Sequence, residues 1–243
     1  DPGLDAAAAA TFREARNVAR GGIAAPLADV GLALVEAREG LGKGDADAAW
    51  TAVARFNAPI AALDAMTRRS PAARPLAAEA RLMRADLLCG WGARLKDVTL
   101  LRAAIDDAAA AADRVDLAYE PLTWARAEIL RGQGLALWGE ASGDIDAVAA
   151  GATTLAGALD HLSKDHSPLD WARTQIALAH ALQTLGDASA DERAYEQAVT
   201  CYDRANLVLK ETPSTPLRGL AAGARAMCLA RSAELTGDLG VLD

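Results

Sequence analysis

The sequence predicts an all-α protein in which antiparallel helix pairs stack into an α-solenoid. Hydrophobic residues make up 52% of the 243 residues but aromatic residues only 4%, and the excess is alanine, which favours helices and their close packing. A 20-residue phrase at 121–140, PLTWARAEILRGQGLALWGE, also returns in altered form at 168–187 as PLDWARTQIALAHALQTLGD. Repetition of this kind indicates stacked helical units, because one unit alone cannot bury its apolar face.

The repeated phrase describes the first helix of each unit, which we name helix A. Three anchors recur at a shift of 47 residues: Pro121, Trp124 and Gly139 match Pro168, Trp171 and Gly186. Fainter copies occupy 26–42, 75–92 and 216–237, and each copy begins Pro-Leu and ends at glycine. Proline is tolerated in the first turn of a helix, and glycine adopts the left-handed turn after its last residue. We therefore expect each helix A to begin at Pro-Leu and to end at the glycine.

One face of helix A is expected to pack in the core. Trp171, Leu178, Leu182 and Leu185 are spaced by 7, 4 and 3 residues, which keeps them on one narrow stripe of a helix. An arginine stands on the same stripe in two earlier copies, Arg84 and Arg131. The apolar stem of an arginine can lie along such a stripe while its guanidinium reaches water at the edge.

The second helix of each unit, helix B, follows a polar turn. It carries a large-x-x-small pattern at 12–15, 56–59, 155–158 and 202–205, with AAAA at 108–111 in the corresponding place. The small residue lets a neighbouring helix approach. Pro59 takes the place of the small residue in one copy, and we expect it to bend its helix or to divide it into two pieces.

These helices predict a single repeat array over 1–243. It consists of a half repeat, four full repeats and a final half repeat: 1–25, 26–74, 75–120, 121–167, 168–215 and 216–243. Stacked arrays normally end in polar capping repeats, whereas the two outer stretches look like separated halves of a repeat. We therefore expect these residues to be a segment of a longer protein.

The clearest block, from 121 to about 210, resembles the tetratricopeptide repeat. It has Trp171 with Leu178 and Leu182 seven and eleven residues on, a glycine near the turn, and small-x-x-x-aromatic-x-x-small in helix B. It is similar in particular to long-period bacterial variants, because the period here is 47 residues and not the roughly 34 of the family. The resemblance implies a right-handed α-superhelix, whose helices A line a concave groove for a peptide, a helix or a protein surface. It also implies that no catalytic residues are present.

The face of helix A opposite the tryptophan stripe is the predicted partner surface. Two columns of polar residues run along it: Glu79, Arg126 and Arg173, and then Asp86, Gln133, His180 and Arg231. A neighbouring column is apolar: Leu82, Ile129, Ile176 and Met227. Either the apolar column packs against the next helix and the polar columns are merely solvated, or the strip binds a partner. In the second case Arg126 and Arg173 would grip carboxylates.

The net charge and the lack of long apolar stretches argue against nucleic acid and membranes as partners. The 25 basic and 33 acidic residues give a net charge of −8, and without clustered positive charge we expect no nucleic-acid partner. No apolar stretch approaches 18 residues, so we expect no direct membrane insertion.

Cys89, Cys201 and Cys228 lack CxxC spacing and are expected to be buried free thiols. Free thiols favour a reducing compartment, so we expect a cytoplasmic protein, and a periplasmic one stays open if a leader was removed.

No motif in the sequence favours catalysis, a cofactor or a metal. His161 and His166 lie five residues apart, which on a helix points them about 140° away from each other. The glycine-rich stretch at 39–45 lacks phosphate-loop spacing, and no nucleophile elbow or HExxH motif occurs. We therefore expect a non-catalytic protein–protein interaction scaffold. Two alternatives stay open: a sensor that binds a small peptide or metabolite to control an attached effector, and a module that self-associates through its end repeats.

Overall fold

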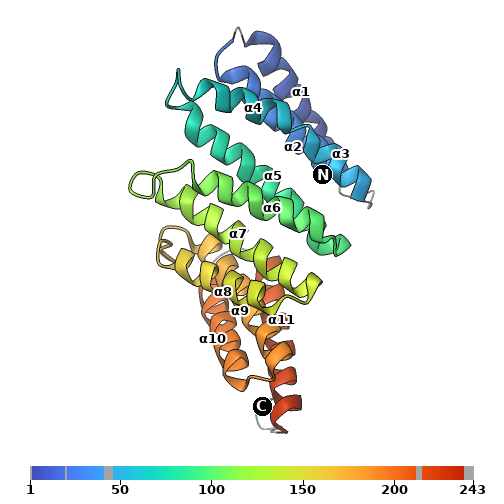
Figure 1. The fold of residues 1–243 in the computed structure, drawn as a ribbon, viewed down its shortest axis with the longest axis vertical. Coiled ribbons are helices and arrows are strands. Elements are labelled where there is room, and N and C mark those ends of the chain that lie inside the picture. The colour runs from blue at the N-terminus through green and yellow to red at the C-terminus, as the bar shows by residue number, and fades with distance from the viewer. Residues whose placement is uncertain (1, 20, 41–45, 212–214, 238–243) are drawn as a thin grey trace. The chain divides into compact units, whose positions relative to one another are not determined.

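The computed structural model describes residues 2–19, 21–40, 46–211 and 215–237, and within them it contains helices and turns but no strand. The helices are α1 (Pro2–Val18), α2 (Ala24–Gly40), α3 (Ala46–Ala54), α4 (Asn57–Met66), α5 (Ala73–Leu95), α6 (Val98–Ala112), α7 (Pro121–Ser142), α8 (Ile145–Leu159), α9 (Pro168–Ser189), α10 (Glu192–Lys210) and α11 (Thr215–Thr236) (Figure 1). The predicted all-α class is confirmed.

The chain forms two compact units, residues 1–130 and 131–243, and the division falls inside α7. In the first unit α1 packs on α2, and α5 packs on both α4 and α6. In the second unit α8 and α10 both pack on α9, and α11 packs on α10 and α9. Packing between neighbours in the chain is characteristic of helical-repeat arrays. The stacking of neighbouring helix pairs is therefore observed within each unit.

The N-terminal boundary of helix A agrees with the prediction. Pro121 and Pro168 are the first residues of α7 and α9. In α2, α5 and α11 a proline lies within the first three residues: Pro26, Pro75 and Pro216. The reason is that a first-turn N–H has no acceptor within the helix, so proline loses nothing there.

The C-terminal boundary of helix A was predicted wrongly in three copies. Gly92, Gly139 and Gly186 lie inside their helices, and the left-handed residue comes four positions later. These left-handed residues are Lys96 (φ 52°), Gly143 (φ 75°) and Ala190 (φ 53°). Bonds from the Asp97 N–H to the Gly92 carbonyl (3.0 Å) and from the Asp144 N–H to the Gly139 carbonyl (2.9 Å) make these ends Schellman turns. Only the last copy ends as expected, at Gly237 (φ 69°), and Gly42 lies outside the described residues.

The interior glycines are explained by the close approach of helix B. A Cβ atom at Gly139 would lie 2.5 Å from the Asp144 carbonyl oxygen and 2.8 Å from the Val148 backbone nitrogen. A Cβ at Gly92 would lie 2.6 Å from Leu101 Cγ. Contacts under 3 Å are too short for any side chain, so glycine is required by packing and not by backbone conformation.

Three of the helices B, α6, α8 and α10, begin at aspartate caps. The side chain of Asp97 accepts hydrogen bonds from the Thr99 and Leu100 N–H groups at the start of α6. Asp144 and Asp191 cap α8 and α10 in the same way. Each cap supplies an acceptor for backbone donors that have none within the helix. Cap and Schellman turn together hold the α5–α6 and α7–α8 connections to a few residues.

Pro59 divides its helix B as predicted. α3 ends at Ala54 and α4 begins at Asn57, so Pro59 lies in the first turn of the second piece. Across the break, the Arg55 and Phe56 N–H groups bond to carbonyls three residues earlier. A continuous helix would need an N–H at residue 59 and would bring the proline ring against the carbonyl of residue 55.

The three cysteines are buried and free, which confirms the prediction. Burial, with the charge of Asp86, raises the pKa of the Cys89 thiol to about 12. Burial likewise raises the pKa of Cys228 to about 11. These thiols are therefore protonated near neutral pH and pack as small apolar side chains.

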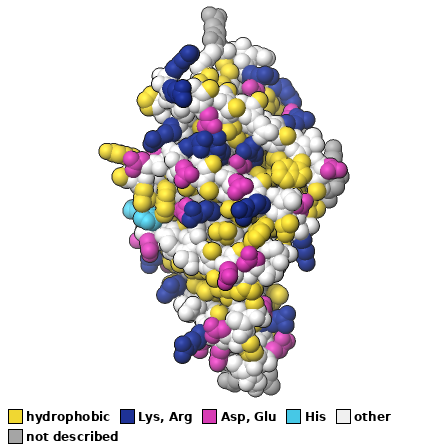
Figure 2. Space-filling view, in the orientation of Figure 1, with side chains coloured by type: hydrophobic (Ala, Val, Ile, Leu, Met, Phe, Trp, Pro, Cys, Tyr) yellow, Lys and Arg dark blue, Asp and Glu magenta, His cyan; other side chains and the backbone are white. Residues whose placement is uncertain are grey.

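The described surface carries charges of both signs. Basic and acidic side chains are interspersed with apolar ones over the face seen in Figure 2. Among the described helices, none combines the length and the apolar character required to cross a bilayer.

The interior glycines provide a test of the packing. Gly139→Ala should lower the free energy of unfolding by about 3 kcal/mol, because the new methyl group would clash with backbone atoms at the start of α8. Gly157→Ala is the matched control, since nothing lies within 4 Å of a Cβ there. It should raise stability by about 0.5 kcal/mol through helix propensity. Urea denaturation followed by circular dichroism measures both, and equal effects would contradict the packing explanation.

Candidate functional site

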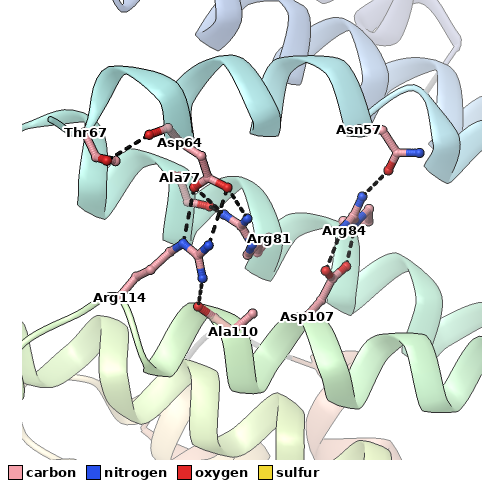
Figure 3. Close-up of polar contacts among 9 residues, drawn as sticks. All are labelled: Asn57, Asp64, Thr67, Ala77, Arg81, Arg84, Asp107, Ala110 and Arg114. Carbon is pink, nitrogen blue, oxygen red and sulfur yellow. Dashed lines mark hydrogen bonds and ion pairs between the residues drawn. The ribbon is translucent and has the colours of Figure 1, made fainter. Parts of the chain in front are cut away.

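A partly buried cluster of polar side chains lies in the first unit, between α4, α5 and α6 (Figure 3). Arg84 on α5 donates from Nε and Nη2 to the two carboxylate oxygens of Asp107 on α6, at 2.5 Å each. It also donates to Asn57 Oδ1 on α4. The side chains of Arg84 and Asp107 are only 18% and 10% exposed. Arg84 is therefore largely held between helices by a carboxylate of α6, a partner that the sequence analysis did not predict.

Asp64 on α4 receives a second set of arginine contacts. Arg81 on α5 donates to Asp64 Oδ2 at 2.5 Å and to Oδ1 at 3.1 Å, and Arg114, just after α6, donates at 3.2 and 3.4 Å. Burial of the carboxyl opposes ionisation, but the hydrogen bonds and charges of the two arginines outweigh it and hold the Asp64 pKa below its ordinary value. One carboxylate thus connects α4 to α5 and to the end of α6.

This polar cluster has no group suited to catalysis. Each of its two carboxylates is neutralised by arginine, and a guanidinium does not give up its proton in proteins. Throughout the described ranges, no group of three histidine, cysteine or acidic side chains could hold a metal ion. Buried charges of this kind must be paired if the fold is to tolerate them, so the cluster holds helices together.

Three of the predicted partner-surface residues contact the preceding helix A. Arg126 Nη1 lies 3.0 Å from both carboxylate oxygens of Glu79, the residue 47 positions earlier in the same column. In the second unit His180 Nε2 lies 3.9 Å from Glu140, and Arg231 Nε lies 3.9 Å from Asp187. Residues Glu140 and Asp187 are themselves 47 positions apart.

Each of these contacts joins two successive helices A, but only the Glu79–Arg126 pair joins two residues of one predicted column. Arg173 instead lies 3.9 Å from Asp170 on its own helix. Asp86 is exposed and Gln133 is half-buried. The role of the seven residues in binding a partner stays a prediction.

An open groove lies in the second unit between α8 and α10, and α9 forms its floor. Its volume is about 640 Å³. We call it the α8–α10 groove. The floor is Leu178, Leu182 and Leu185. The α8 wall is Ala149, Ala152, Thr153 and Ala156, and the α10 wall is Glu196, Gln197, Thr200, Cys201 and Arg204.

Helical periodicity explains which residues line the groove. The α8 residues fall at i, i+3, i+4 and i+7, and the floor leucines at i, i+4 and i+7, so each set occupies one helix face. The floor belongs to the stripe that was predicted to be core. Leu178 is buried as predicted, but Trp171, Leu182 and Leu185 are only half-buried. The alanines of α8 are too short to cover the leucines, and this leaves the floor open.

None of the predicted site residues in the second unit, Gln133, Arg173, His180 and Arg231, lines the groove. The sequence analysis missed Glu196, Thr200 and Arg204, which lie four residues apart on one face of α10. Their spacing on a helix B was the available signal, but only the position of α8 turns that face into a wall. The groove thus combines an apolar floor with charged side chains on the α10 side.

No protein-family model matches the chain, and no match was found among the curated proteins or among the solved structures. The tetratricopeptide-repeat resemblance and the superhelical twist it implies therefore stay predictions. The all-helical fold of neighbouring pairs rests on the structure itself.

Removal of one partner of the buried ion pair should be costly. Arg84→Ala leaves Asp107 buried without its cation, so the free energy of unfolding should fall by roughly 3 kcal/mol. The double variant Arg84→Met with Asp107→Leu removes both charges and should recover most of this loss. Chemical denaturation of the three proteins measures the effect, and a double variant as unstable as Arg84→Ala would contradict it.

The lowered pKa of Asp64 predicts a pH-dependent contribution to stability. Because the folded pKa lies below the ordinary value of 3.8, this contribution is full above pH 3.8 and is lost as the pH falls through the lowered pKa. Asp64→Asn should therefore be less stable than wild type at pH 7, and the difference should shrink below about pH 4. Asp106→Asn is the control, since that side chain is 70% exposed and should show no comparable trend in urea titrations.

Proposed function

We propose that this chain is a non-catalytic interaction module that binds a helix of a partner protein in the α8–α10 groove. The observation that supports this is that two of the α9 floor leucines, Leu182 and Leu185, are only half-buried between α8 and α10. Apolar area that is removed from water contributes roughly 25 cal/mol per Å², so a partner that covers these leucines gains free energy.

The length of the groove fits a helical ligand. The floor spans residues 178–185, which is about 10 Å or two turns of helix. Amphipathic helices that bind in grooves use apolar anchors at i, i+3 or i+4, and i+7. The floor leucines have this spacing themselves, so the ridges of a partner helix can lie between them.

The chemistry of the lining also supports binding. Cys201 is the potential nucleophile among the lining residues, and burial raises its pKa despite the opposing charge of Arg204. A protonated thiol is a poor nucleophile. The remaining polar groups are exposed side chains, Thr153 on α8 and the others on α10, as in the polar border of a protein interface.

The sensor alternative is favoured by one observation, the volume of the groove. About 640 Å³ lies within the range of roughly 300–1,000 Å³ typical of small-ligand pockets. A small ligand would raise the thermal stability of the free protein. We favour a helix because the groove is open to solvent, whereas small-ligand pockets bury most of their ligand.

The proposed function predicts the effect of one leucine. Leu182→Gln should weaken the binding of helical peptides by about tenfold, because it places an amide under the apolar anchors. Leu207→Gln is the matched control, since Leu207 is 64% exposed on α10 and does not line the groove. Peptides selected from a displayed helical library with the wild-type protein are measured on each variant by fluorescence anisotropy.

A third variant separates the two candidate surfaces. Arg126→Glu with Arg173→Glu reverses charge on the predicted face of helices A and should leave the binding of groove ligands unchanged. Peptides lost with this variant and kept by Leu182→Gln would place the binding surface on helices A. Failure of every helical peptide, together with a thermal shift from a small apolar compound, would favour the sensor.

A further inference from the structure

The rim of the α8–α10 groove carries two unpaired charges of opposite sign. Glu196 and Arg204 are exposed and line the groove from α10. Their eight-residue separation places them about 12 Å apart along the helix, too far to pair with each other. In the described ranges neither makes an ion pair with another residue, whereas the adjacent Asp203 is held by Arg225 at 2.5 Å.

The opposite wall carries no charge. The four α8 residues that line the groove are three alanines and a threonine. Short side chains let a second helix approach closely, because interaxial distance depends on the side chains at the contact. An occupant therefore meets three different surfaces: a smooth wall at α8, leucines at the floor, and a negative and a positive charge at α10.

We infer that the occupant is an amphipathic helix whose flank toward α10 carries a basic residue opposite Glu196 and an acidic residue opposite Arg204, about two turns apart. This inference rests on the proposed function. The flank of this helix that faces α8 consists of small residues, and the edge that faces the α9 leucines carries the apolar anchors. Counter-charges are required because burial beside an occupant would otherwise desolvate two unpaired ions.

The same charges set the direction of the occupant. A helix is more stable with acidic residues in its N-terminal half and basic residues in its C-terminal half. The acidic half lies at Arg204, nearer the C-terminal end of α10, and the basic half lies at Glu196. The occupant therefore runs antiparallel to α10, and opposite ends of the two helix dipoles lie side by side.

Two peptides of identical composition test this inference on the intact 243-residue chain. Both carry leucines on one edge and alanines on the flank toward α8. One places Glu in the first half and Lys in the second half, on the flank that faces α10 in the antiparallel direction, and the other exchanges them. End-to-end reversal of the second peptide would move its charges to the α8 side, so it cannot restore the ion pairs.

The first peptide should bind about fivefold more tightly at low salt, and the difference should shrink as salt screens the rim charges. The double variant Glu196→Lys with Arg204→Glu should reverse the preference between the peptides. Both residues are exposed, and circular dichroism with thermal unfolding checks that the variant folds. Lys210→Glu with Glu211→Lys, an exposed pair outside the groove lining, is the matched control and should keep the wild-type preference.

Each other outcome counts against a stated part of the inference. Equal binding of the two peptides, both weakened by Leu182→Gln, would overturn the charge and direction of the occupant and leave the proposed function standing. A preference that survives the exchange of Glu196 and Arg204 would also overturn the inference, because groups other than these two would then recognise the charges of the peptides. Binding of neither peptide to the wild-type protein would overturn the helical occupant and the proposed function together.

Discussion

The close approach of α5 to α6 and of α7 to α8 is the constraint on which the rest of the structure depends. Gly139 brings α7 against Val148 of α8, and Gly92 brings α5 against Leu101 of α6. These contacts are closer than any side chain would allow, so two helices joined by a short turn pack backbone to side chain. The Schellman turn and the aspartate cap then satisfy the exposed backbone groups at the connection.

The charged residues of the polar cluster in the first unit and those of the groove rim in the second unit have different environments. In the first unit, Asp64 and Asp107 lie between helices and are fully occupied by arginines. An unpaired charge there would cost much of the stability of a small unit, so nothing in that cluster is left to bind a ligand. In the second unit, Glu196 and Arg204 stay in water on a groove rim. Hydration satisfies them at little cost, and they can exchange water for the groups of a partner.

The groove exists because the residues of α8 that face it have small side chains. A helix B with large residues on its inner edge would cover the α9 leucines completely. The inner edge of α8 instead has Ala149, Ala152 and Ala156, so the leucines stay half-open. The small residues that permit close helix approach elsewhere thus leave apolar surface uncovered here. The open groove thus results from incomplete packing and requires no irregular loop.

The sequence by itself determined the features that depend on neighbours in the chain. The helices, their starts at Pro-Leu, the division of one helix B at Pro59 and the burial of the cysteines all follow from periodicity and from the chemistry of single residues. The tertiary structure alone decided what depends on the next helix. The interior glycines looked like helix ends, and Arg84 looked like an edge residue, because their reasons lie in Val148, Leu101 and Asp107 on other helices. The groove depends on three helices at once, so no single helical period could distinguish its floor of leucines from a closed core.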